Sequence, residues 1–150
     1  MRDDYAMLNG RGYPDTVDTA FTGPLTPAGD PTQVEHSLIE ATQGQRVLLR
    51  ISNISITRYF TLQSLGIPMT VVGRDARLLR GPGGQNMYYD TNSVTLGGGE
   101  TNDVILDTAG VAPGTYFLYT TNLNYLNNGE QENGGMMTEI IIHPAGAALN

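Results

Sequence analysis

The chain has 150 residues, and its 8 basic residues stand against 15 acidic ones, for a net charge of −7. This length fits a single domain that can bury a core without disulfides or metals. The absence of cysteine excludes disulfides, zinc ribbons, iron–sulfur clusters and thiol nucleophiles. An acidic domain without a basic stripe is also a poor candidate for binding nucleic acid or an anionic membrane.

Few residues offer catalytic or metal-binding chemistry. The two histidines, His36 and His143, lie far apart in the sequence, and neither belongs to a pair with ligand spacing. Carboxylates such as Asp103 and Glu130 could hold calcium or act as acid and base, but scattered acidic residues in loops are more often only solvated. No apolar run approaches the roughly 20 residues that a membrane-spanning helix needs, and the N-terminus lacks the apolar core of a signal peptide.

Short apolar runs separated by turn-forming clusters predict an all-β chain. Strands are expected at residues 37–41, 46–52, 59–65, 69–72, 93–96, 103–106, 115–121 and 136–143. Glycine permits positive φ and proline fixes the entry to a turn, so turns are expected at 43–45, 81–84, 97–99 and 113–114. Proline and glycine in residues 21–32 favour an extended surface loop there.

Two segments near the C-terminus resemble a metal-binding scaffold. Residues 114–122 read Gly-Thr-Tyr-Phe-Leu-Tyr-Thr-Thr-Asn, and residues 134–142 read Gly-Gly-Met-Met-Thr-Glu-Ile-Ile-Ile. They resemble the cupredoxin domains of multicopper oxidases, where a Gly-Thr-aromatic strand ends in His-Cys-His and is followed by another histidine and a Gly-Met element. The resemblance extends from about Met7 to about His143, and it implies a Greek-key β-sandwich of the cupredoxin type.

The copper ligands of this pattern are replaced. By the resemblance, the His-Cys-His triplet and the later histidine correspond to Thr120, Thr121, Asn122 and Leu126. The Gly-Met element is retained at Met136 as the axial-type residue, displaced by a longer loop through 127–131. A blue copper centre needs two imidazoles and a thiolate, with the thioether only a weak axial ligand. Met136 alone therefore cannot hold copper.

A second segment shows the same replacement. The family enters another strand through His-Pro-aromatic-His-Leu-His-Gly, which supplies one blue-site histidine and a His-x-His pair for the trinuclear copper cluster. The corresponding positions are Arg58, Thr61 and Gln63. The guanidinium of Arg58 has no lone pair to offer a metal. The resemblance therefore implies no cofactor in this chain, and copper only in a longer parent protein.

The resemblance implies that residues 1–150 are one domain of a longer multicopper oxidase that couples substrate oxidation to dioxygen reduction. We expect a non-catalytic spacer that contacts neighbouring cupredoxin domains of the same polypeptide and associates weakly with itself. The parent family is typically periplasmic or secreted. Tyr88, Tyr89 and Tyr125 are the candidate interface residues, because tyrosine combines apolar area with a hydroxyl group.

Two other interpretations are open at this stage. One is a free-standing immunoglobulin-like binding module, whose function would lie in loops such as 81–92 and 122–135. The other is a domain of a ceruloplasmin-like or nitrite-reductase-like copper protein. Exposed apolar faces would favour an excised spacer domain, whereas a monomer without them would favour the free-standing module.

Overall fold

The computed structural model describes residues 4–20 and 23–149. Its strands are β1 (Ile39–Thr42), β2 (Arg46–Ser52), β3 (Phe60–Leu65), β4 (Met69–Arg74), β5 (Arg77–Leu78), β6 (Tyr89–Thr91), β7 (Ser93–Leu96), β8 (Thr101–Asp107), β9 (Gly114–Thr120) and β10 (Met137–His143). A short 3-10 helix, η1 (Leu123–Tyr125), lies between β9 and β10. No helix among the described residues is long and apolar enough to cross a membrane.

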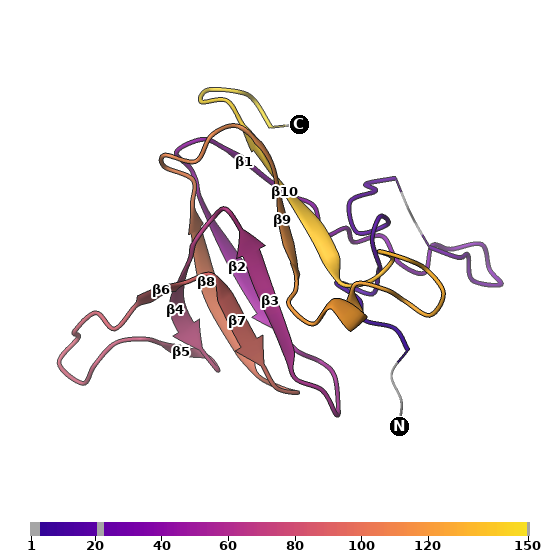
Figure 1. Ribbon diagram of the computed structural model, residues 1–150, viewed down its shortest axis with the longest axis horizontal. Helices are drawn as coiled ribbons and strands as arrows, with labels where there is room; N and C mark the ends of the chain where they lie inside the picture. The colour runs from indigo at the N-terminus through magenta and orange to yellow at the C-terminus, as the bar shows by residue number, and fades with distance from the viewer. Residues whose placement is uncertain (1–3, 21–22, 150) are drawn as a thin grey trace.

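The strands form a sandwich of two sheets. The first sheet has the order β1-β10-β9-β3-β7, and the second has the order β2-β8-β4-β5, with β6 also paired to β4. β1 pairs in parallel with β10, whereas β9 pairs antiparallel with both β10 and β3. The chain crosses repeatedly from one sheet to the other, as in Greek-key sandwiches. Figure 1 shows β9 and β10 side by side, and an arm around β5 and β6 that projects away from the sheets.

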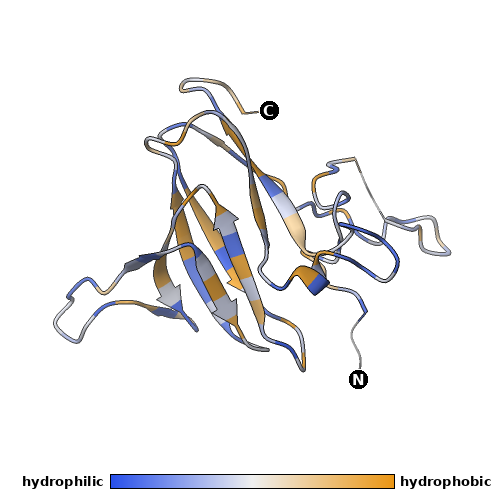
Figure 2. Cartoon of the chain, viewed as in Figure 1, coloured by the Kyte–Doolittle hydropathy of each residue, from blue (hydrophilic) through white to orange (hydrophobic). Residues whose placement is uncertain are grey.

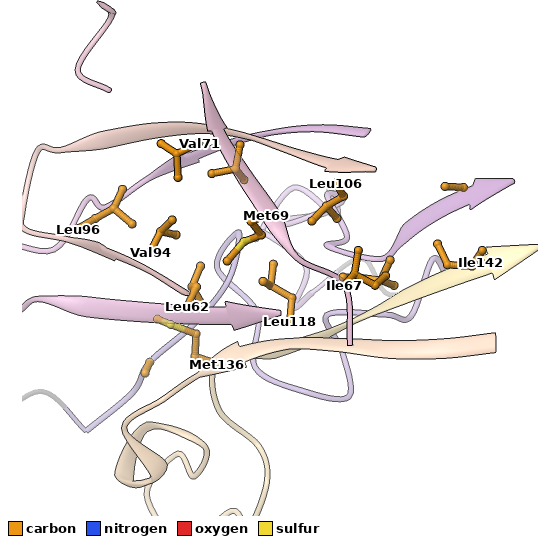
Figure 3. Close-up of a cluster of buried hydrophobic side chains, with 14 residues drawn as sticks. Leu62, Ile67, Met69, Val71, Val94, Leu96, Leu106, Leu118, Met136 and Ile142 are labelled. Atoms are coloured by element: carbon orange, nitrogen blue, oxygen red, sulfur yellow. The ribbon is translucent and has the colours of Figure 1, made fainter. Parts of the chain in front are cut away.

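Alternating side chains build the core between the sheets. Buried and half-buried positions alternate along β8 and β10, as the two-residue period of a strand requires. Figure 2 shows apolar residues, in orange, on the strands of both sheets. Leu62 and Leu118 of the first sheet face Met69 and Leu106 of the second (Figure 3). Burying each such side chain contributes about 1.5–3 kcal/mol.

The predicted all-β sandwich is confirmed, and all eight predicted strands are present with ends that differ by up to two residues. β5 and β6 were not predicted, because they span only two and three residues and are mostly exposed. The described part of the proline-rich segment, residues 23–32, is a largely exposed loop closed by an isolated bridge between Leu25 and Pro31. Phe21 and Thr22 lie outside the described residues.

A buried arginine organises the N-terminal segment that precedes β1. Arg11 is only 2% exposed, and its Nη1 donates to the carbonyl oxygens of Asp15 and Asp18 at 3.0 and 2.8 Å. Its Nη2 donates to the carbonyl oxygen of Gln33 at 3.4 Å. Since hydrogen bonds from charged donors are stronger than neutral ones, Arg11 holds three separate parts of this segment together.

We predict that Arg11→Met lowers the free energy of unfolding by about 2–4 kcal/mol, because three partly buried carbonyl groups lose their charged donor. Urea denaturation followed by far-UV circular dichroism measures this change. Arg50→Met is the matched control, because the Arg50 side chain is 78% exposed and its loss should change stability by less than about 1 kcal/mol. Equal effects of the two substitutions would contradict the role assigned to Arg11.

A tyrosine attaches the same segment to the first sheet. The hydroxyl of Tyr13 donates to Oε1 of Glu139 on β10 at 2.9 Å. This hydrogen bond, with partial burial and the negative charge of Glu139, raises the pKa of Tyr13 above its ordinary 10.0. Because the folded-state pKa is the higher one, the stabilisation is fully present below pH 10.0 and is lost as pH rises through the folded-state pKa.

Tyr13→Phe should therefore lower the unfolding free energy by about 1 kcal/mol at neutral pH. The difference between the two proteins should shrink once pH exceeds 10.0, where Tyr13 of the unfolded wild-type chain ionises. Denaturant midpoints measured for both proteins across this pH range check the prediction. A difference that stays constant up to the most alkaline pH would show that the hydroxyl is not the source of the effect.

Candidate functional site

The predicted ligand positions of β3 and β9 lie side by side. Leu62 of β3 is in register with Thr120 of β9, and the backbone N–H of Thr121 donates to the carbonyl oxygen of Thr61 at 3.0 Å. Since β9 is also paired with β10, it lies between β3 and β10. The structure thus brings the two ligand-like segments together at the same end of the first sheet.

Side-chain alternation sorts these positions onto opposite faces. Thr120 is completely buried in the sandwich interior, as is its partner Leu62. Thr61 and Gln63 are half-buried on the outer face, where the hydroxyls of Thr61 and Thr95 lie 2.8 Å apart. Thr121 is exposed beyond the end of β9. These four ligand-like positions therefore do not all face one point.

Asn122 has a local structural role. Its side chain is the N-cap of η1, and its Oδ1 accepts a hydrogen bond from the backbone N–H of Asn124 at 3.2 Å. Asparagine is among the preferred residues at such caps, because its short side chain reaches an otherwise unpaired N–H group. The amide at position 122 is thus used by the turn after β9.

Met136 lies inside the sandwich beside Thr120. It is 6% exposed, its N–H donates to the carbonyl oxygen of Tyr125 at 2.8 Å, and its own carbonyl oxygen accepts from the N–H of Thr120 at 3.1 Å. The inward-facing residue next to Met136 is therefore Thr120, one position before Thr121, where the resemblance placed the thiolate.

Leu126 and Gly135 are held together at the base of the loop between β9 and β10. The carbonyl oxygen of Leu126 accepts from the N–H of Gly135 at 2.9 Å, so the added residues project beyond this contact. A Cβ atom at Gly135 would lie 2.6 Å from the carbonyl carbon of Leu126 and closer still to the carbonyl oxygen of Tyr125. Only glycine permits this approach.

Asn128 holds the longer loop in place, and sequence reasoning did not identify it. It is 5% exposed, its Oδ1 accepts from the N–H of Ala6 at 2.8 Å, and its Nδ2 donates to the carbonyl oxygen of Gly134 at 2.6 Å. An asparagine in a run rich in asparagine carries no pattern that marks it as buried. Its partner Ala6 is 122 residues away.

Aromatic packing fills the space near Met136. The rings of Phe60 and Tyr125 meet edge to face, with centroids 5.1 Å apart, an arrangement that adds about 0.5–1.5 kcal/mol beyond burial. Both side chains pack against the buried core. Of the three candidate interface tyrosines, Tyr125 thus uses its ring within the domain, whereas Tyr89 is 48% exposed and the guanidinium of Arg80 lies 4.7 Å from the ring of Tyr88.

A buried asparagine positions the loop that carries Arg58. Nδ2 of Asn53 donates to the carbonyl oxygens of Arg58 and Leu96 at 3.0 and 2.8 Å. Next to this loop lies a surface cavity of about 300 Å³, whose lining includes Arg58, Tyr59 and Glu100. Oε2 of Glu100 accepts from the N–H of Gly97 at 2.6 Å, so the carboxylate in the cavity already has a structural hydrogen bond.

The residues around Met136 do not fit a copper ion. The inward-facing donor atoms here are the thioether sulfur of Met136 and the hydroxyl oxygen of Thr120. The Thr120 hydroxyl is buried without a hydrogen-bond partner. The chain has no cysteine to supply a thiolate. His143 lies elsewhere, with its Nε2 3.0 Å from Oε1 of Glu40. Within residues 4–20 and 23–149, no three histidine, cysteine, aspartate or glutamate side chains are grouped as a metal site.

The fold is that of a cupredoxin-type sandwich. A blue copper oxidase from Nitrosomonas europaea is similar over 69% of this chain and 30% of its own, with 23% identity and a TM-score of 0.60. A laccase from Botrytis aclada is similar over 83% of this chain and 22% of its own, with 19% identity and a TM-score of 0.56. This chain therefore covers less than a third of the length of either enzyme. Among curated proteins, none matches it.

The family model described as multicopper oxidase matches residues 2–145. The chain therefore belongs to the multicopper oxidase family, and the resemblance in sequence is confirmed. The immunoglobulin-like alternative does not agree with this membership.

We predict that Thr120→Cys and Thr121→Cys differ in their reaction with a thiol-specific reagent. The thiol at position 120 should react at least about tenfold more slowly under native conditions, because the reagent reaches it only when the strand opens locally. Both thiols should react at similar rates in denaturant. Equal native rates would mean that position 120 does not face the interior.

Proposed function

We propose that this chain is a copper-free structural domain of a multicopper oxidase, which spaces neighbouring cupredoxin domains of the same polypeptide. The observation that carries the proposal is which residues surround Met136. Inward-facing Thr120 and Met136 lie side by side, but the other groups near them pack as an ordinary core. In this proposal the family's cysteine corresponds to Thr120 and not to Thr121, because Thr120 is the residue of 120–122 that faces Met136.

The proposal also explains why the sandwich is retained without a metal. Phe60 and Tyr125 fill the end of the domain, and Asn122 and Asn128 satisfy the backbone of the β9–β10 loop. Each of these groups stabilises the loop through contacts that require no ion. The domain can therefore keep its shape, and hold neighbouring domains apart, while another part of the parent performs redox chemistry.

Exposed apolar side chains support contact with neighbouring domains. In the loop between β2 and β3, Ile54, Ile56 and Tyr59 are 93%, 87% and 75% exposed. Three large and highly exposed apolar side chains in one short loop are unusual for a surface that faces only water. Leu65, on the outer face of the first sheet, is also 53% exposed. These surfaces are suited to interdomain contacts.

The chain should retain no copper at a structured site. After incubation with Cu²⁺, or with Cu⁺ under reducing conditions, dialysis should leave substoichiometric metal, because thioether and hydroxyl groups alone bind copper weakly. The melting temperature should also be insensitive to copper and to a chelator. Metal analysis and calorimetry provide the measurements.

Matched variants make this experiment specific. Met136→Leu removes the buried thioether, and Met87→Leu removes an exposed one of the same chemistry. One retained copper per chain that is lost with Met136→Leu and kept with Met87→Leu would overturn the proposal. So would oxidation of a phenol or of Fe²⁺ by this chain above the rate of a buffer control with the same copper concentration.

A further inference from the structure

An arm of residues 77–89 projects from the second sheet. β5 and β6 pair with successive parts of the same strand, Leu78 with Gly73 and Tyr89 with Val71 of β4. The chain between β5 and β6 leaves the sheet, and Figure 1 shows it extending away from both layers. None of the ligand-like positions on β3, β9 or the loops beside them lies on this arm.

Hydrogen bonds and ring stacking make the arm a defined structure. The N–H of Met87 donates to the carbonyl oxygen of Leu79 at 3.2 Å. The N–H of Gly81 donates to the carbonyl oxygen of Gln85 at 2.9 Å. The guanidinium of Arg80 stacks on Tyr88 at 4.7 Å from the ring centroid. A partly ordered segment loses less conformational entropy on docking than a flexible loop does.

The arm has the composition of a protein-binding surface. Leu78, Met87 and Tyr89 are 58%, 59% and 48% exposed. Arg77 and Arg80 are its only charged residues, so all 15 acidic residues of the chain lie outside it. Tyrosine, methionine and arginine are the residue types enriched at the centre of protein interfaces. The arm is therefore a cationic and apolar projection on an acidic protein.

The opposite end of the molecule is acidic. Its exposed carboxylates belong to the segment before β1 and to the loop between β9 and β10, and they are Asp4, Asp18, Asp30, Glu35, Glu130 and Glu132. The two segments are in contact, because the N–H of Gly129 donates to the carbonyl oxygen of Asp4 at 3.2 Å. Among the described residues of these two segments, the arginine is Arg11, and it is buried. Figure 1 shows both segments on the side of the sandwich away from the arm.

We propose that the arm binds the acidic end of a second copy of this chain. The charges are complementary, and they would steer the two surfaces together before the apolar side chains make contact. The two surfaces are different, so the contact is heterologous, and each bound copy still offers a free arm and a free acidic end. Association should therefore continue beyond the dimer, head to tail.

Sedimentation velocity over a range of protein concentrations tests this proposal. At an ionic strength of about 0.1 M, where charges act over about 10 Å, the repulsion between two copies of net charge −7 is largely screened but the arm and the acidic end still attract at contact. We expect dimers and longer species there that increase with concentration. At about 1 M, where the screening length is about 3 Å, the same protein should be monomeric. A strict monomer at the lower ionic strength, or association that does not respond to salt, would overturn the proposal.

A charge exchange identifies the two surfaces. Arg77→Glu with Arg80→Glu should weaken association by at least about tenfold, and Glu130→Arg with Glu132→Arg should do the same. A mixture of the two double variants should associate again, because the reversed arm of one protein fits the reversed end of the other.

The control is Arg46→Glu with Arg50→Glu on β2, which changes the net charge as much as the arm variant does but leaves the arm unchanged. It should associate like the wild-type protein. If the control and the arm variant lose association equally, overall charge and not the arm is responsible, and the proposal fails. Failure of the mixture to associate would also contradict it. Neither result would affect the spacer proposal, which rests on the residues around Met136.

Discussion

The position of β9 between β3 and β10 constrains most of this structure. Because β9 is hydrogen-bonded on both edges, a shift of its register by one residue would turn every side chain to the opposite face. This pairing places Leu118 in the core and Thr120 beside Met136, and it leaves Thr121 exposed. The same constraint decides which of these ligand-like residues faces the interior.

The sequence was sufficient to predict the strands but not the register in which they pair. Short apolar runs between turn-forming clusters identified long strands such as β8 and β10, whereas β5 and β6 span only two and three residues. The resemblance to cupredoxins placed ligand-like positions on β3 and β9, which are neighbours. It could not decide between Thr120 and Thr121 as the inward-facing residue, because that depends on pairing between distant strands.

Buried polar residues were the other class that escaped sequence analysis. Arg11 and Asn128 each bond to backbone groups in other segments, and nothing in their own neighbourhood distinguishes them from solvated residues. Gly135 shows the converse case. Its Gly-Met motif suggested a metal site, but the contact with the carbonyl groups of Tyr125 and Leu126 accounts for the glycine without any metal. The glycine of this motif thus has a packing role that requires no metal.

The parallel pairing of β1 with β10 bears on how this chain folds. Ile39 is in register with Ile140, so one edge of the first sheet closes only when the last strand is available. Contacts between residues so distant in sequence require costly loop closure and slow the folding of β-sandwiches to milliseconds or longer. Until then β1 is without its partner and one edge of β9 is open, and unpaired edges of this kind invite pairing with other chains. During synthesis, the period before residues 137–143 emerge is therefore the interval of greatest aggregation risk.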